Sequence, residues 1–138
     1  MTTVTLDAPR STSATSHLLA ATGRVLLAAI FVLSGVSKLA DPTGTIAYIT
    51  SAGLPAPSLA YALAVIVELV GGLLLIAGFR TRIVASAIAA FSLAAAFGFH
   101  ANLADQNQFI HFFKNVAMAG GLLQVAAFGS GGFGFDRR

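Results

Sequence analysis

The chain has 138 residues, of which 57% are hydrophobic and only 9% are charged, against about 25% charged in a typical soluble domain. Because these few charged side chains cannot cover the surface of a soluble bundle, we expect an integral membrane protein of one domain. The formal charge of +3 does not indicate nucleic acid, because the basic residues form no patch. The absence of cysteine excludes disulfides, iron–sulfur clusters and covalently attached c-type haem.

The N-terminal third of the chain predicts a tail, a membrane crossing and a short surface helix. Residues 1–16 are polar and rich in Ser and Thr, which favours a disordered tail. The apolar stretch after Arg24 has the length of a signal peptide core, but Lys38 closes it and no small-residue cleavage site follows. We therefore expect an uncleaved transmembrane helix over 17–39. Asp41 and Pro42 then begin a helix that is too short to cross and suits the membrane surface, with Ile46, Tyr48 and Ile49 dipping in.

Three further apolar stretches predict three further crossings, over residues 58–79, 82–102 and 109–128. The short turn at 78–82, with Thr81 as a candidate helix cap, makes the second and third crossings antiparallel neighbours. Glycine pairs at 71–72 and 120–121 would let helices approach closely in lipid. The predicted fold is all-α: a four-helix transmembrane bundle over 17–128, with the surface helix in its first outer loop and a glycine-rich, basic tail over 129–138.

Charge asymmetry predicts the orientation of this bundle. Four crossings place both termini and the turn at 78–82 on one side, with six basic residues: Arg10, Arg24, Arg80, Arg82, Arg137 and Arg138. Lys38 and Lys114 fall on the other side. The positive-inside rule then predicts that both termini are cytoplasmic.

Glu68 lies in the middle of the second crossing, where an ionisable residue costs about 2.5 kcal/mol or more unless it faces protein or water. Counting residues from the inner boundary places Arg24 within reach of that depth, so we predict a buried Arg24–Glu68 ion pair. Two alternatives stay open: Arg24 snorkels to the cytoplasmic interface, and Glu68 is protonated or hydrogen-bonded to a helix.

A second polar group is expected near the outer surface, where each of the four helices contributes at a similar depth. Its members are candidates for binding a small ligand: Lys38, Tyr61, His100, Lys114 and Asn115. Each alone could be an interfacial anchor. His100, His111 and Asp105 have no specific metal-ligand spacing, so no metal site is predicted. No nucleophile–base pair occurs, so no residue is predicted to be catalytic.

Five motifs follow one another over about residues 20–129: R24-x6-F31-x2-SGVSK38-LADP, GLPAP, E68-LVGGLLLIAGFRTR, FH100 and FFK114-N115-VAMAGGLL. In this order and spacing the chain resembles the DoxX family of small four-helix proteins of the bacterial inner (plasma) membrane. The resemblance implies roles for Arg24, Lys38, Glu68, His100, Lys114 and Asn115. The family takes its name from a membrane subunit associated with thiosulfate:quinone oxidoreductase, and some members belong to redox complexes for sulfur compounds or oxidative stress. Relatives that handle thiols use cysteines, which this chain lacks.

Three functions stay open on this basis. The chain is a subunit of a redox complex, with a quinone or another small molecule bound at the outer mouth and with a soluble or membrane oxidoreductase as partner. It has no electron carrier of its own, so no intrinsic cofactor is expected. Alternatively it is a non-catalytic scaffold for partner proteins, or a carrier for a small anion or amphiphile. The expected partners are the lipid bilayer, the oxidoreductase and further copies of the chain, and nucleic acid is not expected.

Overall fold

The structure, a computed structural model, describes residues 13–136. Its regular elements are the helices α1 (Ala14–Ala40), α2 (Pro42–Ser51), α3 (Pro57–Val65), the π-helical turn η1 (Ile66–Val70), α4 (Gly71–Ala77), α5 (Thr81–Phe99) and α6 (Gln106–Phe128). Residues 14–16, predicted as tail, form the first turn of α1, because Ser13 caps the helix by accepting a hydrogen bond from the Ser16 N–H at 3.2 Å. The rest of the predicted N-terminal tail, with Arg10, and the last two arginines lie outside the described residues.

Three helical runs in the described part of the chain are long and apolar enough to cross a membrane: Ala14–Ala40, Pro57–Ala77 and Thr81–Phe99. The second run is α3, η1 and α4 joined end to end. Helix α6 has 23 residues, which is about 35 Å of helix, but it is not among these apolar runs. The fourth crossing and the orientation therefore remain predictions.

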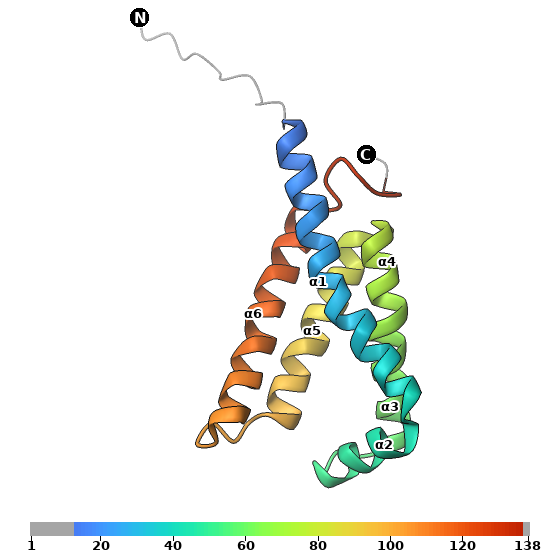
Figure 1. Cartoon of the computed structure of the whole chain (residues 1–138), viewed down its shortest axis with the longest axis vertical. Helices are drawn as coiled ribbons and strands as arrows, with labels where there is room; N and C mark the ends of the chain where they lie inside the picture. The colour runs from blue at the N-terminus through green and yellow to red at the C-terminus, as the bar shows by residue number, and fades with distance from the viewer. Residues whose placement is uncertain (1–12, 137–138) are drawn as a thin grey trace, which may run out of the picture.

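Figure 1 shows the long helices side by side, with the start of α1 and the C-terminal segment at one end and α2 at the other. Helix α5 packs along α6, and α1 packs along η1 and α4. The predicted helix α2 is confirmed: Pro42 is in its first turn, and the Asp41 side chain accepts a hydrogen bond from the Gly44 N–H at 2.9 Å. Tyr48 of α2 stacks on Phe99 of α5, with ring centroids 5.4 Å apart, so α2 is held against the bundle.

Two glycines set the register between α1 and the helix that follows α3. A Cβ on Gly72 would lie 2.7 Å from the Val32 side chain, and a Cβ on Gly35 would lie 2.9 Å from the Leu69 Cβ. Both distances are too short for any side chain, so glycine is needed for this close antiparallel approach. The contacts fix which residues of α1 face Glu68. Beneath them lies a core of small and branched side chains: Ala28, Phe31, Leu75, Ala85, Ile88, Ala89, Ala119 and Leu122.

The C-terminal segment, residues 129–136, folds back over the end of the bundle that holds Arg24, Arg80 and Arg82, which we call the arginine end (Figure 1). The Asp136 carboxylate accepts hydrogen bonds from the backbone N–H groups of Arg80 and Thr81 at 2.6 and 2.8 Å. Thr81 is therefore the first residue of α5 and not its cap, and Asp136 supplies the missing acceptor. Hydrogen bonds from Thr81 and from the backbone of Arg80 lower the pKa of Asp136, as does the nearby Arg24 guanidinium.

Candidate functional site

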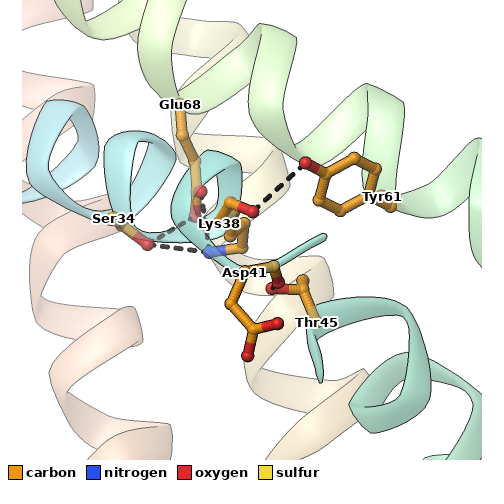
Figure 2. Close-up of polar contacts among 6 residues, drawn as sticks. All are labelled: Ser34, Lys38, Asp41, Thr45, Tyr61 and Glu68. Atoms are coloured by element: carbon orange, nitrogen blue, oxygen red, sulfur yellow. Dashed lines mark hydrogen bonds and ion pairs between the residues drawn. The ribbon is translucent and has the colours of Figure 1, made fainter. Parts of the chain in front are cut away.

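Glu68 lies on the π-helical turn η1 in the middle of the second apolar run. A π turn is rare and is often found at functional sites. The residue is buried, with 6% of its surface exposed, and its side chain points toward the last turns of α1 (Figure 2). A carboxylate at this position needs partners from the neighbouring helix.

Those partners are Ser34 and Lys38, which are four residues apart and therefore share one face of α1. The Lys38 Nζ lies 2.8 Å from the Glu68 Oε2 and also donates a hydrogen bond to the Ser34 Oγ at 2.8 Å. The Ser34 hydroxyl in turn donates to the Glu68 Oε1 at 3.2 Å. The three side chains form a closed polar ring, which we call the Glu68 triad (Figure 2).

The predicted Arg24–Glu68 ion pair is wrong. Arg24 is buried about four turns before Lys38 on α1, where its guanidinium donates to the Ser130 carbonyl and, at 3.4 Å, to the Ile76 carbonyl. The antiparallel register explains the error, because Gly35 faces Leu69 while Arg24 lies beside Gly78. Glu68 is therefore level with Ser34 and Lys38. The alternative that Arg24 snorkels to the cytoplasmic interface stays a prediction; the structure shows that its guanidinium donates a hydrogen bond to a backbone carbonyl of the C-terminal segment.

The Glu68 triad is attached to two further elements through Lys38 and Asp41. The Tyr61 hydroxyl of α3 donates a hydrogen bond to the Lys38 carbonyl at 3.1 Å, which ties the last turn of α1 to α3. Asp41 caps α2, and the Thr45 hydroxyl donates to the Asp41 carbonyl at 2.8 Å. Figure 2 shows these residues around the triad. The end of α1 is thus held between α2 and α3.

A cavity of about 650 Å³ lies beside the triad, between α1, α2, α3 and α5. Its polar lining comes from Ser37, Lys38, Asp41, Thr45 and Glu68. The rest of its wall is mainly apolar and aromatic: Tyr48, Ile49, Leu54, Ala60, Leu63, Ala64, Phe91, Ala94, Ala95 and Phe99, with Gly44. We call it the larger cavity. An apolar chamber with a few charged groups on one wall suits an amphiphilic ligand.

A smaller cavity of about 360 Å³ contains the two predicted polar residues of α6, Lys114 and Asn115. Ser34, Glu68 and Phe91 also line it. Glu68 and Phe91 therefore border both cavities. Glu68 is thus the charged group that lies between the larger cavity and the lysine of α6.

The predicted outer cluster of five residues does not form as one group. The His100 Nδ1 and the Gln108 Oε1, which accepts, lie at a hydrogen-bond distance of 2.8 Å, and the His100 ring stacks on His111 with centroids 5.1 Å apart. The Lys114 Nζ lies 3.0 Å from the His111 Nδ1, and the Asn115 amide donates to the His111 carbonyl at 3.0 Å. These residues make a separate group between α5 and α6. Neither His100 nor Tyr61 lines either of the two cavities.

Comparison with known proteins matches residues 19–101 to the DoxX family, a range that holds the whole Glu68 triad. The chain belongs to the DoxX family. It is 36% identical over 114 residues to the inner membrane protein YqjF of Escherichia coli, covering 83% of this chain and 86% of YqjF. It is 35% identical over 120 residues to the inner membrane protein YphA of the same organism, with the same coverage. No solved structure matches the chain.

These relatives make the protein a multi-pass protein of the bacterial inner membrane. A shorter match, 46% identical over 61 residues, covers 44% of this chain and 44% of the Bacillus subtilis protein named "Putative oxidoreductase CatD". Every lining residue of the larger cavity lies within the range that matches the DoxX family, whereas Lys114 and Asn115 lie beyond it. The larger cavity is thus the part of the site that the family match covers completely.

Two parts of the site were not predicted from the sequence: Ser34 of the Glu68 triad and the apolar walls of the larger cavity. Ser34 precedes Lys38 by four residues, and this spacing alone could have placed both side chains on the face that meets Glu68. The apolar walls had no such signal, because Leu63, Phe91 and Phe99 resemble any lipid-facing residue in a transmembrane stretch.

Proposed function

We propose that the protein is the membrane subunit of an oxidoreductase complex and that the larger cavity binds the headgroup of a quinone. The observation that carries this proposal is the ion pair of Lys38 and Glu68 in the wall of a mainly apolar cavity. A buried ion pair rarely improves stability over an apolar pair of similar volume. Its presence beside a chamber of ligand size therefore favours a role in binding.

The chamber fits a quinone in size and in chemistry. Its volume of about 650 Å³ falls within the usual range of about 300–1,000 Å³ for small-molecule sites. The ammonium of Lys38 can donate a hydrogen bond to a ring carbonyl, since it has three donors and uses two of them on Ser34 and Glu68. Phe91, Phe99 and Leu63 provide apolar surface for the ring and its chain.

A bound quinone would supply the redox chemistry, taking up two electrons and two protons per molecule reduced. The electrons would come from the partner oxidoreductase, because no electron carrier is expected on this chain. The side chains of this chain bind and orient the ring, and Glu68, which borders both cavities, is placed to hold a proton for it. The name of the relative CatD supports an oxidoreductase context. With both termini cytoplasmic, as the positive-inside rule predicts, the site faces the outer side of the membrane.

Quinone retention tests the proposal. Protein purified from native membranes in mild detergent should carry a quinone, measured by solvent extraction and mass spectrometry. The double variant Lys38→Met/Glu68→Leu replaces the pair by apolar side chains of similar size, so it should fold and retain at least tenfold less quinone. Ser86→Ala is the control, because the exposed Ser86 hydroxyl donates a hydrogen bond to the Arg82 carbonyl of its own helix and lines neither cavity. Equal retention by the double variant and the parent would refute the quinone site and favour a scaffold.

A further inference from the structure

A third cavity, of about 450 Å³, lies at the other end of the bundle, at the start of α5 and the end of α6. Arg80 and Arg82 line it together with Gly129, Ser130 and Asp136. In the described part of the chain, neither guanidinium has an ion pair or a hydrogen bond to another group. Two guanidinium groups without such a partner among residues 13–136 thus share one hollow in the protein surface.

The one acidic residue in this cavity, Asp136, offsets only one of the two arginine charges. Both carboxylate oxygens of Asp136 accept hydrogen bonds from backbone N–H groups of Arg80 and Thr81. With two arginines and one aspartate in its lining, the cavity keeps a net charge of +1. Gly129, at φ 80°, lies against Arg82: a Cβ there would be 3.3 Å from the Arg82 Nε. This glycine leaves room for Arg82 to lie over the C-terminal segment.

Large apolar side chains surround the same cavity and are open to the surroundings. Ile83, Phe128 and Phe135 line it with 64%, 70% and 76% of their surfaces exposed. At the end of a transmembrane helix, exposed apolar side chains can contact lipid tails while neighbouring arginines reach the headgroups. A ligand of this cavity would therefore meet two cations and an apolar rim at once.

From this combination we propose that Arg80 and Arg82 bind the phosphate of an anionic phospholipid, whose acyl chains lie against Ile83 and Phe128. Arginine forms paired hydrogen bonds to phosphate oxygens, which gives geometry as well as charge. The net positive lining selects an anionic headgroup over a zwitterionic one, whose ammonium would lie near the arginines. Basic pockets between transmembrane helices at the membrane surface are known to take such headgroups. This lipid site is separate from the quinone site and does not depend on it.

The test measures lipid retention by native mass spectrometry of the purified full-length protein, with phosphatidylglycerol compared with phosphatidylcholine. The wild type should retain phosphatidylglycerol preferentially. Arg80→Gln and Arg82→Gln should each lower that retention by about tenfold or more, the loss expected when one charge-assisted hydrogen bond is removed. Arg82→Lys, which keeps the charge and loses the planar fork, should retain an intermediate amount. Lys114→Gln is the charge-matched control at the opposite end and should match the wild type.

Three outcomes would overturn the lipid site. Equal retention of the two lipids by the wild type would mean that the arginines interact only with the general membrane surface. Unchanged phosphatidylglycerol retention in the double variant Arg80→Gln/Arg82→Gln would place the lipid elsewhere. Displacement of the lipid by soluble glycerol 3-phosphate at equal concentration would show a site for a free phosphate without any contribution from the apolar rim.

Discussion

Removing one partner of the Lys38–Glu68 pair should affect stability very differently from removing the other. Lys38→Met leaves Glu68, which is 6% exposed, without its cation, and breaking a buried pair in this way costs about 3–5 kcal/mol. Glu68→Gln should cost less, about 1–3 kcal/mol. Its amide oxygen still accepts from Ser34, and the Lys38 side chain, 25% exposed, can turn toward water. Replacing both by Met and Leu should restore stability to within about 1 kcal/mol of the parent.

The assay is reversible unfolding in mixed micelles, followed by circular dichroism. On the scale of soluble domains of this size, 1 kcal/mol corresponds to about 4 °C in the melting temperature. Lys38→Met should therefore melt about 12–20 °C below the parent. Lys114→Met is the control, because Lys114 is exposed and a surface contact contributes less than about 1 kcal/mol.

The same series checks the register of α1. Arg24 lies far from Glu68 in the structure, so the effects of Arg24→Met and Glu68→Gln should add to within about 0.5 kcal/mol. Equal losses for Lys38→Met and Glu68→Gln, or a strong coupling between Arg24 and Glu68, would refute the pairing described for the triad.

Three further predictions follow from other parts of the molecule. Reporter fusions after residue 138 should read cytoplasmic and fusions within 103–107 external; an external C-terminus would contradict the four-crossing topology. Asp136→Ala should destabilise the protein by about 1 kcal/mol, the usual loss of a helix cap. The folded-state pKa of Asp136 is lowered. The stability difference between the parent and Asp136→Ala should therefore be full above the ordinary carboxyl pKa of about 3.9 and vanish as the pH falls through the folded-state pKa. A stability difference that does not change with pH in acid-stability measurements would exclude the charged cap. His100→Phe should leave quinone retention unchanged, because His100 lines neither the larger nor the smaller cavity. A loss of quinone retention in this variant would show that His100 contributes to the quinone site.

The helices could be predicted from the sequence because their signals are local. Asp41 and Pro42 begin α2, and the apolar stretches have the length of membrane crossings. The predicted ends of the helices were less accurate: the third crossing was expected to reach residue 102, whereas α5 ends at Phe99. The cap of α5 was missed altogether, because Asp136 lies more than fifty residues away in the chain.

The partners of Glu68 could not be predicted from depth alone. Counting residues from a helix end gives a height in the membrane, but the packing of Gly35 on Leu69 decides the relative height of α1. The π turn at Ile66–Val70 also changes the direction of Glu68 relative to a regular helix, and no residue pattern indicated it. The separation of His100 from Lys38 likewise depends on how α5 and α6 pack together, which hydropathy does not describe.

Photolabelling tests the central claim, a quinone site at the Glu68 triad, most directly. Native membranes containing the full chain are irradiated with a quinone that carries a diazirine on its ring, and labelled positions are mapped by mass spectrometry. The label should fall on the walls of the larger cavity, at residues such as Leu63, Phe91 and Phe99. Excess unlabelled quinone should suppress it, and so should Lys38→Met/Glu68→Leu. Labelling scattered over lipid-facing residues, without competition and unchanged in the double variant, would contradict the account.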